Sequence, residues 1–389
     1  MTGRRTWRRT WPRTWRAGAA AALALLAGGC WSTRPGVPSL EPSTPLGALP
    51  LYSDAGAIAR LGPQASADRP FAPMRFGQDD VLDVLALSGG GSHGAFGAGV
   101  LKGWSESGTR PSFDVVTGIS TGALTAPFAF LGAAHDDELE RLYTTSGDDA
   151  IFESRGLAGL FGDGLRDTAP LRRRVTEAIT PAMLDEIAAE HRKGRRLYVG
   201  TTDLDTGEAV VWDLGDIAQG ADPARRRRFT DVLVASASVP GLFNPVYLDD
   251  GRGGAARMHV DGGVKAPLLL RDFMVDGRYR SKAAYFIVNG CICLRNATEP
   301  VAPSTLAISR KSIEELMRSS LYRALAGAMG MARKAGARPA LSFAPDAVKL
   351  PSPLSFDPAE MRALFEVGRA QGRNWRRWPA EPPRMQRFG

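Results

Sequence analysis

Hydrophobic and polar positions between residues 81 and 373 alternate in a way that predicts short buried strands separated by helices. The predicted strands include residues 81–87, 114–117, 196–201, 209–212, 283–288 and 341–343. The predicted helices include residues 95–106, 121–131, 136–145, 169–179, 304–335 and 358–373. Strands that alternate with helices favour an α/β fold in which a mostly parallel central sheet is flanked by helices.

The first 30 residues do not follow this pattern. Their apolar run, residues 17–27, is shorter than the roughly 20 residues that span a bilayer, and it follows an arginine-rich start, as in a secretory signal. The two glycines and Cys30 that follow resemble the lipobox of bacterial lipoproteins, although Ala27 stands where leucine is usual. The resemblance implies a signal peptide over residues 1–29, cleavage before Cys30 and a lipid on its sulfur; the alternative is an ordinary secretory signal.

A proline-rich segment separates this leader from the predicted fold. Residues 31–73 contain eight prolines and little periodicity, which is typical of an extended linker. We therefore expect a tether over residues 30–78 and a folded domain over residues 79–389. Trp31, rather than an aspartate, follows Cys30, so an exported lipoprotein at the outer membrane or in the periplasm is the favoured location.

The net charge gives no reason to expect a nucleic-acid partner. The chain carries a formal charge of +8, but residues 1–29 contain six arginines and no acidic residue, and the charge without them is +2. Two further arginine runs, residues 172–174 and 225–228, are interpreted as solvated helix starts, and contact with anionic lipid head groups is the alternative. We expect no cofactor and no metal site.

A glycine-rich turn follows the first predicted strand. Gly89, Gly90 and Gly91 precede Ser92 and the next helix, so their backbone amides can face a developing negative charge. The same residues match a dinucleotide-binding fingerprint, but Asp114 begins a strand where that motif needs an acid at a strand's end. No lysine follows the glycines, which excludes a Walker-type loop.

A nucleophile elbow is predicted after the second strand. Gly118-Ile119-Ser120-Thr121-Gly122 has a strand before it and a helix after it, which is the context that places a reactive serine above a sheet. Gly118 and Gly122 relieve crowding in the tight turn. Later in the chain, Asp261-Gly262-Gly263 ends another short strand, where the carboxylate can reach the same edge of the sheet.

Together these segments resemble the patatin-like phospholipase family, which has a glycine-rich loop, a Gly-x-Ser-x-Gly elbow and a later Asp-Gly-Gly in this order. Residues 235–243 also resemble a serine- and proline-containing stretch of that family. The resemblance covers residues 81–290 and implies a three-layer α/β sandwich, with core motifs between residues 85 and 263. It further implies that Ser120 is the nucleophile, that Asp261 is the base, and that Gly89, Gly90, Gly91 and Ser92 supply the oxyanion hole.

One position departs from the family pattern. His93 stands where arginine or lysine is common, which puts the preference for a lipid head group in doubt. His93 could either hold the glycine-rich loop or face an anionic head group. The positions of the other histidines help to identify the general base. A Ser-His-Asp triad needs a histidine, and none follows residue 261, which favours an aspartate as the base. A Ser120–His259 pair oriented by Asp203 remains an alternative. His135 and His191 lie in polar helical segments and are expected to be solvated.

Two cysteines remain beyond the leader. Cys291 and Cys293 lie two apart on a strand-like run, where a disulfide between them would be strained, and they are expected to be small buried side chains without a chemical role.

The sequence thus predicts a membrane-tethered serine hydrolase that cleaves acyl esters, with phospholipids or related lipids as the substrate class that the resemblance implies. The alternatives are a non-catalytic lipid-binding or assembly lipoprotein, and an esterase or thioesterase with the same residues.

Overall fold

The computed structural model describes residues 76–77, 80–145, 153–154, 166–220, 223–240, 242–249, 256–292 and 301–382. The predictions for the signal peptide, for Cys30 and for most of the tether fall outside these residues. Phe76, which precedes the first strand, is already buried in the core.

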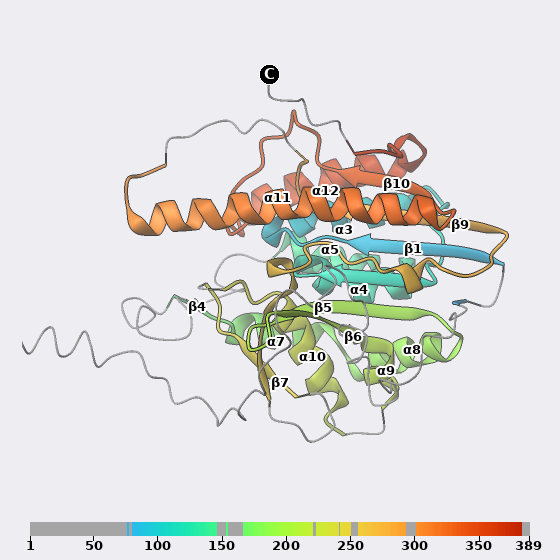
Figure 1. Cartoon of the computed structure of the whole chain (residues 1–389), viewed down its shortest axis with the longest axis horizontal. Coiled ribbons are helices and arrows are strands. Elements are labelled where there is room, and N and C mark those ends of the chain that lie inside the picture. The colour runs from blue at the N-terminus through green and yellow to red at the C-terminus, as the bar shows by residue number, and fades with distance from the viewer. Residues whose placement is uncertain are drawn as a thin grey trace, which may run out of the picture.

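An eight-stranded sheet forms the centre of the described part of the chain (Figure 1). Its order is β10 (Arg338–Phe343), β9 (Ser281–Val288), β1 (Val81–Leu87), β2 (Val115–Ile119), β5 (Arg196–Asp203), β8 (Arg257–Asp261) and β7 (Val246–Leu248), and β6 (Glu208–Asp213) also pairs with β5. The strands from β10 to β5 run parallel, whereas β6, β7 and β8 join antiparallel. The predicted mostly parallel sheet is therefore confirmed.

Helices cover both faces of this sheet. The helices are α3 (Gly94–Glu106), α4 (Thr121–Leu131), α5 (Asp136–Thr144), α7 (Ala169–Ala178), α8 (Pro181–Arg192), α9 (Leu214–Gln219), α10 (Arg225–Ser236), α11 (Thr305–Lys334) and α12 (Pro358–Arg373). A separate ribbon of two short strands, β3 (Glu153–Ser154) and β4 (Arg166–Asp167), lies between α5 and α7 in sequence.

Side chains of β1 point alternately to the two faces of the sheet, and each face has its own hydrophobic core. Leu85 and Leu87 pack in the core formed with every helix except α11, whereas Val84 and Ala86 pack in the opposite core with α11 and residues 268–275. This arrangement makes the three-layer α/β sandwich that the sequence predicts.

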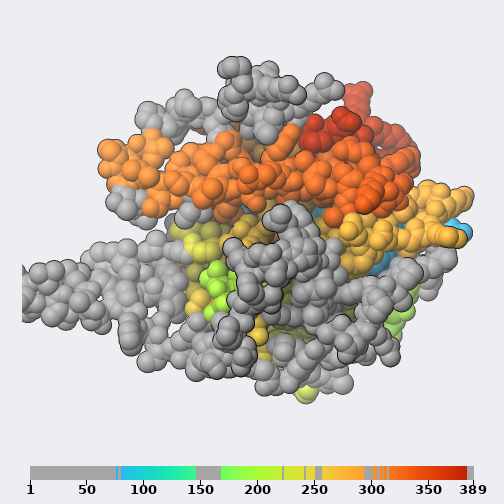
Figure 2. Space-filling model, in the orientation of Figure 1, coloured from blue at the N-terminus to red at the C-terminus, as the bar shows by residue number. Residues whose placement is uncertain are grey.

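Helix α11 differs along its length. Figure 1 shows its N-terminal half extending past the sheet, and Figure 2 shows the helix at the surface of this face. Its buried side chains, such as Leu325 and Met329, lie in the C-terminal half, whereas Ile308 and Leu316 are exposed in the N-terminal half. Within the ranges given above, no helix has both the length and the apolar character that crossing a bilayer requires.

Two expectations about single residues are wrong. His191 is buried rather than solvated, because α8 packs on α9, where the ring lies against Gly215. Burial is the main cause that lowers its pKa to about 4. Cys291 is disulfide-bonded rather than without a chemical role, and its partner lies outside the described residues.

The strand register brings the candidate site residues to one level of the sheet. Leu87 of β1 lies opposite Gly118 of β2, so the glycine-rich turn and the serine turn leave the sheet side by side. On the other side of β2, Ile119 pairs with Gly200, and the next residue of β5, Thr201, pairs with Asp261. Ser120 and Asp261 therefore flank the same part of β5.

Candidate active site

Ser120 occupies a strained turn between β2 and α4. Its φ of 55° is the only positive value found at a non-glycine residue among those described, and such strain is typical of a nucleophile elbow. The turn needs glycine on either side. A methyl group on Gly118 would overlap the carbonyl oxygen of Gly122, and one on Gly122 would meet the carbonyl oxygen of Leu87 at 2.5 Å.

Ser236, at the end of α10, fixes this elbow. Its hydroxyl accepts a hydrogen bond from the Ser120 amide at 3.0 Å and donates one to the Gly200 carbonyl at 2.7 Å. Two residues later, the Ser238 carbonyl accepts a hydrogen bond from the Asp261 amide at 2.9 Å. Residues 235–243, the stretch that resembles the patatin-like family, thus hold the backbone of both Ser120 and Asp261. The sequence did not reveal this role.

Asp261 ends β8 with its side chain fully buried. Its Oδ1 accepts a hydrogen bond from the Gly263 amide at 2.6 Å, which orients the carboxylate. The Thr202 hydroxyl donates a hydrogen bond to the backbone carbonyl of Asp261 at 3.0 Å. A methyl group on Gly262 would overlap the Gly200 carbonyl, so the first glycine of the Asp-Gly-Gly turn allows β8 to approach β5 closely.

The environment of Asp261 favours its protonated form. Burial raises its pKa to about 6, although hydrogen bonding from the Ser120 side chain and from the Gly263 amide acts in the opposite direction. The contact with Ser120 is looser than a regular hydrogen bond, since Oδ2 is buried with no partner of regular geometry. Loose contacts of this kind are common in sites without substrate. The arrangement gives a carboxylate that titrates near neutral pH beside a strained serine.

The glycine-rich turn offers fewer free amides than its sequence predicts. The Gly89 amide donates to the Pro267 carbonyl at 3.2 Å, and the Ser92 amide donates to the Pro353 carbonyl at 2.8 Å. Within the described part of the chain, the Gly90 and Gly91 amides have no such acceptor. Gly89 lies directly beside Ser120, because a methyl group there would be 3.2 Å from the serine Cβ.

Asn289, at the end of β9, supports this turn from below. Its amide nitrogen Nδ2 donates to the Ser88 carbonyl at 2.7 Å, and its backbone amide donates to the Ser88 hydroxyl at 2.9 Å. A methyl group on Gly90 would overlap the Asn289 carbonyl oxygen. Sequence reasoning missed Asn289, because it sits in an otherwise apolar run and its partner is 201 residues away.

His259 and Asp203, the residues of the alternative to the dyad, face each other on neighbouring strands. His259 Nδ1 lies 2.9 Å from the Thr201 hydroxyl, and its ring packs edge-on against Trp212. Asp203 pairs with His259 in the sheet, but its carboxylate accepts from the amides of Asp205 and Thr206 and from the Arg257 side chain. His135 Nε2 lies 2.8 Å from the Glu186 carboxylate, outside the site.

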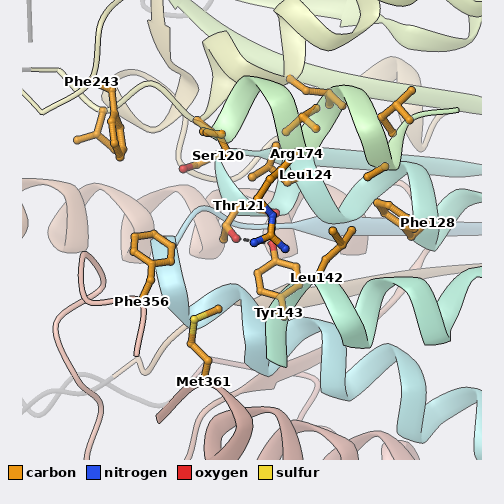
Figure 3. Close-up of a pocket in the computed structure, with 18 of the residues that line it drawn as sticks. Ser120, Thr121, Leu124, Phe128, Leu142, Tyr143, Arg174, Phe243, Phe356 and Met361 are labelled. Atoms are coloured by element: carbon orange, nitrogen blue, oxygen red, sulfur yellow. Dashed lines mark hydrogen bonds between the residues drawn. The ribbon is translucent and has the colours of Figure 1, made fainter. Parts of the chain in front are cut away.

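An apolar cavity of about 910 Å³, open space at its mouth included, begins at Ser120. Its walls come from α4, α5, α7, α10 and the segment that joins β10 to α12 (Figure 3). Aromatic and aliphatic side chains from these elements face into it, among them Phe128, Leu142, Phe243 and Phe356. A cavity with such an apolar lining suits an acyl chain.

Arg174 is the charged side chain in the lining of this cavity. The two arginine runs are less solvated than predicted, because most of their side chains are half-buried; Arg172 and Arg227 pair with Asp231, and Arg225 pairs with Asp185. No group of three or more metal-ligating side chains occurs among residues that the structure describes. The predicted lipidation site, Cys30, lies outside them.

A family model and two solved structures are similar to this chain. Residues 85–274 match the family model described as patatin-like phospholipase. Among solved structures, VipD from Legionella pneumophila matches with 11% identity and a TM-score of 0.42, over 77% of this chain and 67% of that one. The structure of full-length SpcU in complex with full-length ExoU from Pseudomonas aeruginosa matches with 14% identity and a TM-score of 0.33, over 77% of this chain and 52%, or about half, of that one. Comparison with curated proteins gives no match.

Proposed function

We propose that the protein, whose residues 85–274 match the patatin-like phospholipase family model, hydrolyses acyl esters of lipids with Ser120 as nucleophile and Asp261 as general base. The observation that carries this proposal is the strained Ser120 at the mouth of an apolar cavity, in contact with a buried carboxylate. His259 is not needed, since Thr201 and Trp212 already hold its ring.

In the proposed mechanism Asp261 takes the Ser120 proton while the hydroxyl oxygen attacks the acyl carbonyl carbon. The carbonyl oxygen becomes negatively charged and is held by the Gly90 and Gly91 amides, the two donors of the turn that remain available. Asp261 then gives the proton to the departing alcohol, which leaves an acyl-serine. Water, deprotonated by the same carboxylate, releases the fatty acid and restores Ser120.

A substrate panel tests the proposal against its alternatives. We expect the folded protein to release fatty acid from phospholipids or lysophospholipids, and Ser120→Ala to lose this activity. Hydrolysis restricted to short thioesters would favour the thioesterase alternative. A wild-type protein that binds lipid vesicles and hydrolyses none of the panel would favour the non-catalytic lipoprotein instead.

The reaction should depend on pH through Asp261. A general base must be ionised, and the pKa of Asp261 is about 6, so kcat/KM should fall about tenfold for each pH unit below this value. Above it the rate should reach a plateau. Initial rates on a soluble uncharged ester across this range measure the profile. A rate that stays constant from about pH 5 to pH 8 would contradict the assignment of Asp261 as base.

Arg174 supports an anionic lipid as the substrate class, because it places a guanidinium in a predominantly apolar lining. Losing a charge-assisted hydrogen bond costs about 1.5–3 kcal/mol, so Arg174→Gln should lower the ratio of phospholipid to neutral-ester hydrolysis by about tenfold or more. Arg173→Gln is the matched control, since Arg173 lies on the same helix and is exposed. An equal ratio in both variants would remove Arg174 from head-group recognition.

For the N-terminal region, the proposal includes export, lipid attachment at Cys30 and a proline-rich tether that holds the hydrolase near a membrane surface. The run of apolar residues followed by small residues and a cysteine supports it. Metabolic labelling with a fatty acid, compared between the wild type and Cys30→Ser, tests this part independently of the active site.

A further inference from the structure

A segment far along the chain connects the acyl cavity to the glycine-rich turn. We call residues 345–357, which join β10 to α12, the strap. Three hydrogen bonds fasten it to the residues that follow Gly91. The Ser92 amide donates to the Pro353 carbonyl at 2.8 Å, the Ser92 hydroxyl donates to the Ser352 carbonyl at 3.3 Å, and His93 Nε2 lies 2.9 Å from the Pro351 carbonyl.

His93 contributes to this junction as a neutral donor. A carbonyl oxygen only accepts hydrogen bonds, so the proton of the ring lies on Nε2. Burial lowers the pKa of His93, which keeps the ring uncharged at neutral pH. His93 is 8% exposed, and its Nε2 is hydrogen-bonded to the strap. This environment suits holding the loop better than binding a head group.

The other side of the strap forms part of the cavity wall. Leu354 and Phe356 line the cavity that begins at Ser120, and Figure 3 shows the Phe356 ring on the wall beside Met361. Gly91 lines the same cavity, and a methyl group on it would overlap the Pro353 carbonyl oxygen. The strap therefore contacts both the space for an acyl chain and one of the two proposed oxyanion donors.

The far end of the strap is fixed. Asp357 caps α12 by accepting hydrogen bonds from the amides of Ala359 and Glu360, each at 2.9 Å. Helix α12 in turn packs along α3, the helix that begins directly after His93. A substrate that packs against Leu354 or Phe356 therefore contacts a segment that is fixed at α12, and its effect is transmitted to the glycine-rich turn.

We propose that the strap makes the acyl chain itself position the oxyanion hole, with His93 as the positioning residue at the junction. The proposal rests on the function proposed above. An acyl chain long enough to pack against Leu354 and Phe356 holds the strap in place, and the three hydrogen bonds hold the Gly90 and Gly91 amides toward Ser120. Binding energy from a remote part of the substrate then appears in kcat rather than in KM alone.

The test compares kcat for butanoate and dodecanoate esters of the same leaving group. In the wild type, kcat should be about 3- to 10-fold higher for the longer chain, which corresponds to one net hydrogen bond. In His93→Leu this difference in kcat should disappear, while KM should still fall with chain length. In His93→Gln, whose side-chain amide keeps a donor, the difference should return. A wild-type kcat that does not rise with chain length, or a rise that persists in His93→Leu, would overturn the proposal.

A second pair of variants leaves the junction intact. Leu354→Ala removes a strap contact with the chain, and Leu142→Ala makes the same change on α5, across the cavity. The chain-length effect on kcat should be lost in the first variant and kept in the second, although KM for the longer chain should rise in both. Equal behaviour of the two variants would overturn the coupling. A wild type that hydrolyses neither ester nor any phospholipid would instead reject the proposed function.

Discussion

Replacing Asp261 with asparagine should lower kcat by about 10⁴-fold, which is the typical loss when a catalytic carboxylate is replaced by an amide. Asparagine fits the same space and still accepts the hydrogen bond from the Gly263 amide, but it takes no proton from Ser120. Ser120→Ala should cause a loss at least as large. Steady-state rates on one phospholipid and one soluble ester measure both effects.

Folding stability provides the control for Asp261→Asn. The pKa of Asp261 is about 6 in the fold against 3.8 for the free group, so the fold disfavours the ionised carboxylate by up to about 3 kcal/mol above pH 6. Asparagine removes this cost. The variant should therefore unfold at higher denaturant concentration than the wild type at pH 8, and this difference should shrink below pH 6 and vanish only below 3.8, where the carboxyl is protonated in both states.

His259→Ala distinguishes a Ser–Asp dyad from the Ser–His alternative. The dyad predicts that turnover survives, with stability lowered because the Thr201 hydroxyl and the Trp212 ring lose their contacts with the imidazole. If a folded His259→Ala protein were as inactive as Asp261→Asn, the histidine would be the base.

Replacing Gly91 with alanine should lower kcat by about 10²–10³-fold, which is the typical cost of losing one oxyanion donor. The φ of Gly91 is +56°, and the added methyl group would overlap the Pro353 carbonyl, so the turn has to shift away from Ser120. Rates on a soluble ester measure the effect, because such a substrate needs no membrane surface.

Gly108→Ala is the matched control for backbone strain. Gly108 has a similar φ of +68°, but nothing lies within 4 Å of the added methyl group. This variant should lose about 1–2 kcal/mol of stability and keep its activity. Similar activity of the Gly91 and Gly108 variants would place the oxyanion donors elsewhere.

Residues that act through local sequence could be predicted well. Ser120 and the glycine-rich turn lie directly after strands that pair in parallel, so alternation and glycine spacing place them together at one edge. Asp261 was predicted at that edge too, although β8 runs antiparallel to β5. The level of Asp261 is set by its pairing with Thr201, which no local pattern encodes.

Residues that act through distant contacts could not be predicted. Ser236 reaches the elbow from 116 residues away, and the strap meets Ser92 and His93 from about 260 residues away. Hydrophobic periodicity identifies a buried face but not the element that covers it, which is also why His191 was expected to be solvated. The number of usable amides in the glycine-rich turn is likewise decided by Pro267 and Pro353, far along the chain.

Labelling with a fluorophosphonate, followed by mass spectrometry of the labelled peptide, tests most directly whether Ser120 is the nucleophile. We predict that the wild-type protein carries one label, on Ser120, and that Ser120→Ala carries none. Asp261→Asn should label much more slowly. A folded wild-type protein that takes no label, or a label on any other serine, would contradict the assignment.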